Sequence, residues 1–111
     1  MKNIFPEPIT KLPLADVPLK GVTAYLSQSV DHQTLYMQFD ETVELPEHQH
    51  ADQVGFVLEG KIEMTIDGIK NCFVKGDRYH IPAGVKHSAT IYAGYADITV
   101  FMEPNRYKIK G

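Results

Sequence analysis

Residues 46–60 read PEHQHADQVGFVLEG, and residues 76–87 read GDRYHIPAGVKH. The first stretch holds two histidines, His48 and His50, separated by one residue. Side chains alternate between the two faces of an extended strand, so histidines at this spacing point to the same side. A third histidine, His87, closes the second stretch. Because neutral imidazole is a common ligand of transition metals, the three histidines together predict a metal site.

The segments around these two stretches read as short strands joined by turns. β-Branched and aromatic residues dominate residues 22–30 and 34–39, and no segment from residue 21 to 102 shows a helical period over three turns. The strongest hairpin signal is Asp67-Gly68, which separates an alternating segment, 61–66, from its return, 69–74. Further strands are expected over 87–92 and from 95 or 96 to 102. Many short strands at close spacing predict an all-β sandwich or barrel.

The length and charge of the chain limit its class. A chain of 111 residues predicts a single domain, and 14 acidic against 11 basic residues with no basic run argue against nucleic acid or a membrane as partner. The single cysteine, Cys72, has no partner for an internal disulfide and is interpreted as a small core residue. No apolar stretch resembles a secretory signal or a membrane span, so a cytoplasmic location is expected.

The first twenty residues differ from the rest of the chain. Residues 1–20 contain four prolines, which are expected to prevent a regular helix or central strand, and many apolar side chains. We therefore expect an N-terminal arm over 1–20 that packs on the barrel or on a second subunit, followed by a barrel domain over 21–111.

The two opening stretches resemble the two motifs of the cupin superfamily, in its small single-domain, conserved-barrel form. The first motif has a glycine, five residues, His-x-His, three or four residues, a glutamate, six residues and a glycine. The second has a glycine, five residues, Pro-x-Gly, two residues, a histidine, three residues and an asparagine. The matching positions are His48, His50 and Gly60 in the first motif and Gly76, Pro82, Gly84 and His87 in the second.

This resemblance implies a double-stranded β-helix, or jelly-roll barrel, with one metal ion held inside by His48, His50 and His87. Thr42 and Ile91 replace the first glycine and the final asparagine of the motifs. The more important departure concerns the glutamate of the first motif.

Two residues compete for the position of that glutamate. Counting back six residues from Gly60 leads to Gln53, whereas regular alternation from His48 and His50 would send Asp52 to the same face. Gln53 is preferred, because an irregularity before the strand is easier to accept than a broken register within it. The predicted metal site is therefore His48, His50, Gln53 and His87, with Asp52 as the alternative to Gln53.

A glutamine in this place changes the electrostatics of the site. Three neutral imidazoles and an amide leave a divalent ion its full charge, so an anionic substrate or hydroxide should bind more readily. The donor set suits Zn, Fe, Ni, Mn or Cu about equally. A further histidine, His80, is expected to line a pocket or pack rather than to bind the metal.

Two functions are compatible with these features. The first is a metal-dependent enzyme acting on a small molecule, with a dioxygenase-like oxidative cleavage as the first choice and an isomerase as another member of the class that the resemblance implies. The alternative is a non-catalytic barrel that binds a small metabolite or a sugar, with an anchoring or structural metal. Because residues 54–58 are apolar on both faces, a homodimer is also predicted.

Overall fold

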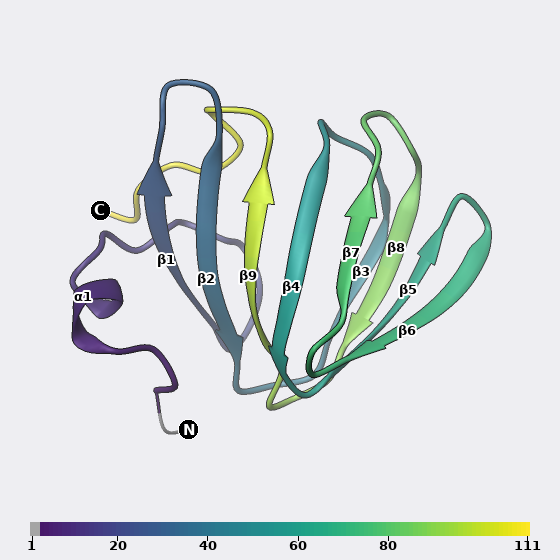
Figure 1. The fold of residues 1–111 in the computed structure, drawn as a ribbon, viewed down its shortest axis with the longest axis horizontal. Coiled ribbons are helices and arrows are strands. Elements are labelled where there is room, and N and C mark those ends of the chain that lie inside the picture. Colours follow the sequence, from purple (N-terminus) through teal and green to yellow (C-terminus); the bar gives the residue numbers. More distant parts are fainter. Residues whose placement is uncertain (1–2) are drawn as a thin grey trace.

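The computed structural model describes residues 3–111, which form one short helix and nine strands (Figure 1). In chain order the elements are α1 (Glu7–Thr10), β1 (Val22–Gln28), β2 (Gln33–Phe39), β3 (Val43–His48), β4 (Gln53–Glu59), β5 (Lys61–Ile66), β6 (Ile69–Val74), β7 (Arg78–Ile81), β8 (His87–Ile91) and β9 (Ala96–Phe101). Every strand pair is antiparallel. The predicted all-β jelly roll is confirmed.

The strands form two sheets that face each other. One sheet has the order β1-β2-β9-β4-β7, and the other has the order β3-β8-β5-β6. Figure 1 shows β1 and β2 on the left of the molecule and the β5–β6 hairpin on the right. From β3 onward the chain passes repeatedly from one sheet to the other, so the connection between β3 and β4 crosses between the sheets.

The hairpin at Asp67-Gly68 forms as predicted. β5 and β6 pair from Lys61 opposite Val74 to Ile66 opposite Ile69, which leaves two residues in the turn. Both turn residues have positive φ, 50° for Asp67 and 78° for Gly68. A two-residue turn of this kind matches the twist of the flanking strands, and Asp-Gly is a preferred pair for it.

The residues before β1 contain a short helix that the prolines were expected to prevent. α1 is a single turn with a proline in its first two positions, where the missing N–H would have no intrahelical partner. Close by, the Phe5 ring packs edge-on against Tyr25 and Tyr36. The segment that follows α1 forms a bridge between Leu14 and Tyr25.

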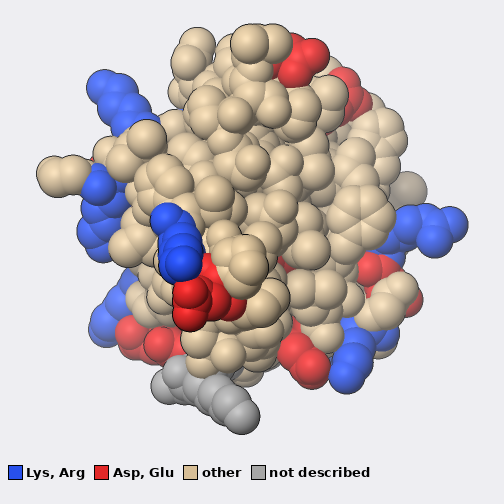
Figure 2. Space-filling view, turned by 60° about the vertical axis from the view of Figure 1, so that its left-hand side comes forward, with Lys and Arg blue, Asp and Glu red and all other residues tan. Residues whose placement is uncertain are grey.

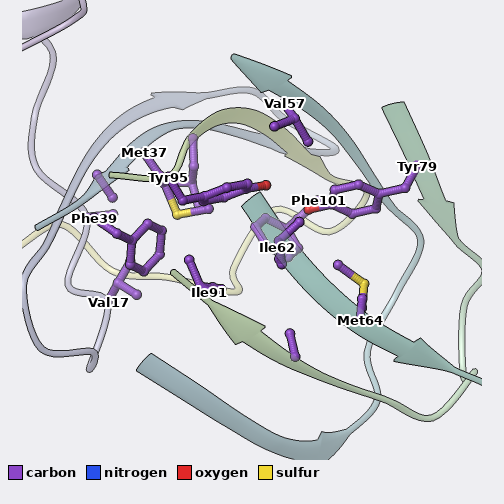
Figure 3. Packing of buried hydrophobic residues seen from close by; sticks show 14 of the residues in the cluster. Val17, Met37, Phe39, Val57, Ile62, Met64, Tyr79, Ile91, Tyr95 and Phe101 are labelled. Carbon is purple, nitrogen blue, oxygen red and sulfur yellow. The ribbon is translucent and has the colours of Figure 1, made fainter. Parts of the chain in front are cut away.

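The core lies between the two sheets (Figure 3). Its buried members are Ala15, Val17, Ala24, Leu26, Leu35, Met37, Phe39, Val57, Ile62, Met64, Tyr79, Ile81, Ala89, Ile91, Tyr95 and Phe101. In Figure 3 the rings of Tyr79 and Tyr95 extend toward one another; the Tyr79 hydroxyl accepts from Gln53 and the Tyr95 hydroxyl donates to Asp97. Polar groups are therefore built into the middle of an otherwise apolar core.

Two further observations concern the surface. The interpretation of Cys72 as a core residue is wrong, because Cys72 is exposed on the edge strand β6. Among residues 3–111, no helix has the length and apolar character needed to cross a membrane.

Candidate metal centre

His48 and His87 are brought together by the pairing of β3 with β8. The two residues are partners in the register, beyond an irregularity that begins at Leu45. Their ring centroids lie 4.2 Å apart. The irregularity coincides with Pro46, which has no N–H to donate to the ladder. A local break in β3 thus sets the position of the first histidine.

His50 joins this pair from the connection between β3 and β4. Its ring centroid lies 5.3 Å from that of His48 and 4.7 Å from that of His87. One ligand nitrogen from each of the three rings lies within 4.8 Å of the others. The three predicted histidines therefore form one cluster where the chain crosses from one sheet to the other.

Each of the three rings is oriented by a hydrogen bond from its Nδ1 to a backbone carbonyl. His48 donates to the Pro46 carbonyl at 2.8 Å, His50 to the Ala51 carbonyl at 2.7 Å and His87 to the Val85 carbonyl at 2.9 Å. A carbonyl only accepts, so Nδ1 carries the hydrogen and Nε2 keeps its lone pair. The chain thus fixes the tautomer that a metal requires.

The environment also favours the uncharged form of two of these rings, His50 and His87. Burial, the charge of Arg106 and the neighbouring histidines lower the pKa of His50 to about 4, although its bond to Ala51 acts in the other direction. Burial is likewise the main cause that lowers the pKa of His87. The Nε2 atoms of these two residues are buried and have no hydrogen-bond partner within residues 3–111. Neutral imidazoles with free lone pairs fit a divalent transition metal.

The structure separates the two candidates for the fourth position. Gln53, the first residue of β4, is buried and lines the same cavity as the histidines. Its Nε2 donates to the Tyr79 hydroxyl at 3.4 Å. Asp52 instead bonds to His80 at 2.7 Å, and that pair is exposed. The break in regular strand geometry between His50 and Gln53 turns Asp52 away from the cluster.

His80 does not belong to the cluster. It lies on the outward face of β7 with an exposed side chain, where it lines a separate pocket together with Phe73 and Tyr79, in keeping with the pocket-lining expectation. Its bond to Asp52 lowers the pKa of that carboxyl group.

A cavity of about 350 Å³ leads to the histidines between the two sheets. Most of its wall is apolar, with Met37, Ile62 and Met64 among the lining residues. Two charged residues that sequence reasoning did not select, Asp97 and Arg106, also line it. The only feature of the sequence that pointed to Asp97 was an acidic residue within a strand of alternating apolar residues. Nothing in the sequence of residues 103–111 pointed to Arg106.

Comparison with known proteins then decides the family. A family model described as a cupin domain matches residues 35–100, more than half of the chain. This chain is a cupin. The matched residues include all three clustered histidines and Gln53.

Part of the cupin is similar to a curated enzyme. Over 45 residues it is 44% identical to quercetin 2,3-dioxygenase of Bacillus subtilis (strain 168), which is 39% of this chain and 13% of that protein. The cupin thus spans about an eighth of the length of this relative.

Solved structures share its fold. An RmlC-like cupin from Shewanella frigidimarina superposes with a TM-score of 0.73 at 23% identity, covering 95% of this chain and 94% of the other. Oxalate decarboxylase of Bacillus subtilis, a protein with Mn(II) centres, superposes with a TM-score of 0.71 at 18% identity, covering 87% of this chain and 29% of the other.

Proposed function

We propose that this cupin is a metal-dependent enzyme acting on a small molecule, with dioxygenase-like oxidative cleavage as the first reaction to test. One observation carries the proposal: one ligand nitrogen from each of three histidines lies within 4.8 Å of the others, at the wall of a cavity of about 350 Å³. Three ligands leave further coordination positions of a divalent ion open toward that cavity. An open position is what distinguishes a catalytic centre from a closed structural one.

His48, His50 and His87 would hold the ion, and their Nδ1 bonds to the backbone would keep the rings in place. A bound metal of this kind polarises an oxygen atom or lowers the pKa of water. Gln53 has its amide nitrogen engaged by Tyr79, so its oxygen would orient a ligand or complete the metal site. The apolar walls of the cavity would exclude bulk water from the reacting group.

The relatives support the same class of function. Quercetin 2,3-dioxygenase is named for an oxidative reaction, and oxalate decarboxylase has Mn(II) centres. The three imidazoles do not select among Zn, Fe, Ni, Mn and Cu. The proposal therefore specifies one divalent transition metal per chain and leaves its identity to measurement.

Elemental analysis of the purified protein tests the metal centre. Wild type should carry about one transition metal per chain, and a double variant, His48→Ala with His87→Ala, should carry none. His80→Ala is the matched control, because His80 is an exposed histidine outside the cluster, and it should keep the metal. Wild-type protein that takes up none of the five metals would overturn the proposal.

Oxygen consumption with a flavonol and with a diketone then tests the reaction. The metal-loaded wild type should consume oxygen, and the double-histidine variant should not. Tight binding of a small metabolite or sugar, without turnover and unaffected by metal removal, would instead support the non-catalytic barrel with a structural metal.

We also propose that the cupin forms a homodimer through the outward face of β9 and β4. Val54 and Phe56 lie beside Val100 and Ile98 there, and Phe56 is 43% exposed. Phe5 covers the neighbouring β1–β2 part of the same sheet and leaves this part uncovered. Arg78 and His80 of β7, the register partners of Phe56 and Val54, border this patch, and its apolar centre can pack against its own copy, as a two-fold interface requires. A cytoplasmic location remains a prediction from sequence.

A further inference from the structure

Arg106 lines the histidine cavity and forms no ion pair within residues 3–111. Its Nε is buried and lacks a hydrogen-bond partner within that range. A half-buried cation without a counter-ion is unfavourable, because its lost hydration is not replaced. The cavity therefore offers a site for an anion.

The guanidinium is held in place by aromatic rings. Its central carbon lies 5.0 Å from the ring centroid of Phe101 and 5.1 Å from that of Tyr107. Phe101 also packs against His50, with ring centroids 5.5 Å apart. The same ring thus connects the arginine with the metal centre, and rings that hold a guanidinium on its flat side leave its N–H edge for a ligand.

The segment that carries Arg106 is fixed at several points. The Glu103 carboxylate accepts from the Ala51 backbone N–H at 3.0 Å, which ties this segment to the connection that bears His50. Tyr107 exchanges two hydrogen bonds with the buried side chain of Gln33, at 2.8 and 3.0 Å. Arg106 is therefore positioned before any ligand arrives, which reduces the entropy lost on binding.

The other charged residue of the cavity does not neutralise Arg106. Asp97 accepts a hydrogen bond from the Tyr95 hydroxyl at 2.6 Å, and it forms no ion pair with Arg106. With Gln53 uncharged and no carboxylate paired with Arg106 within residues 3–111, this end of the cavity is positive.

We propose that Arg106 binds the carboxylate of a small, otherwise largely apolar molecule. A further oxygen of the same molecule, outside the carboxylate, reaches the three-histidine centre. A guanidinium presents N–H groups in a fork that matches a carboxylate. The volume of about 350 Å³ and the mainly apolar wall limit the rest of the molecule to a short hydrocarbon body. The contact between the further oxygen and the histidine centre rests on the proposed metal-dependent function. The contact between the carboxylate and Arg106 does not.

The test compares acids with their uncharged esters. Pyruvate and 4-methyl-2-oxopentanoate, and the methyl ester of each, are titrated into zinc-loaded and metal-free wild-type protein while the side-chain Nε–H signal of Arg106 is followed by NMR. The signal is assigned by its absence in Arg106→Lys. The acids should shift this signal and the esters should not. Arg106→Gln should weaken binding of the acids about tenfold to hundredfold, and Arg106→Lys should weaken it less.

Lys108→Gln is the matched control, because it removes the same charge from an exposed position two residues away, and it should bind the acids as wild type does. Equal binding of acid and ester, or equal binding of the acid by wild type and Arg106→Gln, would overturn the proposal. If none of the five metals binds, the metal centre fails, yet an acid preference that depends on Arg106 in metal-free protein would still support the carboxylate site.

Discussion

Asp97 has its carboxyl group inside the sandwich, where only 1% of the residue is exposed. Burial raises its pKa to about 7, against the opposing effect of the hydrogen bond from the Tyr95 hydroxyl. Between about pH 4 and pH 7 the folded protein therefore keeps a proton on Asp97 that the unfolded chain has lost. Proton uptake on folding means that this residue makes stability fall as pH rises through that window.

Asp97→Asn should remove this dependence. The amide has no charge to bury, so the variant should gain in unfolding free energy relative to wild type between about pH 5 and about pH 8, by about 1.4 kcal/mol for each pH unit between pH 5 and the Asp97 pKa of about 7. Urea unfolding of both metal-free proteins at the two pH values measures it. His50 and His87, whose lowered pKa values give the opposite slope, are present in both proteins, so their effects cancel in the comparison. An equal difference at both pH values would contradict the prediction.

The residues of the site show how far sequence reasoning extends. The three histidines could be predicted because His-x-His and the later histidine belong to motifs with fixed spacing. The choice between Gln53 and Asp52 depended on where the strand begins, and Asp52 is turned outward because regular geometry ends before it. Arg106 could not be predicted, since its segment is placed by hydrogen bonds of Glu103 to Ala51 and of Tyr107 to Gln33, both distant in sequence.

At the scale of the elements, β4 and β7 depend on Gly55 to pack. A Cβ at this position would lie 2.2 Å from Cζ of Tyr79, the residue paired with it on β7. Tyr79 is buried against the Phe73 ring, with centroids 5.2 Å apart, and bonds to Gln53. The missing side chain of one strand thus makes room for an aromatic ring that supports the site from the next.

Gly55→Ala should therefore destabilise the protein by about 1 to 3 kcal/mol, the usual effect of overpacking. In a Tyr79→Ala background the same substitution should have little further effect, because the ring that it meets is gone. Chemical denaturation of the four proteins of this double-mutant cycle measures the coupling. Additive effects of the two substitutions would show that Gly55 is required for another reason.

The elements also differ in how well their sequences determine them. The β5–β6 hairpin was predictable because Asp67-Gly68 fixes both the turn and the register. The side on which Cys72 lies was not, because β6 is an edge strand and burial there depends on what covers the sheet. A short helix after Pro6 formed because a proline is tolerated in a first helical turn.

At the scale of the whole molecule, the two faces of the larger sheet have different surroundings. Its inner face covers the cavity and the core, while part of its outer face lies open on β9 and β4. Figure 2 shows the side of the molecule on which α1 lies. Charged side chains lie mostly toward the edge of this view, and the area across its upper middle is uncharged. Sequence patterning predicted that residues 54–58 would be apolar on both faces, but only the exposure of Phe56 shows that residues 3–20 leave part of this face uncovered.

The proposed dimer can be tested by changing the centre of that open face. Wild-type protein should have twice the mass of the 12.5 kDa chain at micromolar concentration, as measured by light scattering after size exclusion. Phe56→Glu should give a monomer, because two like charges would then meet across the two-fold axis without water. Ile69→Glu is the matched control, since Ile69 is also an exposed apolar residue, on β6 in the other sheet, and it should leave the dimer intact. A monomeric wild type would exclude the dimer, and a dimeric Phe56→Glu would place the interface on another face.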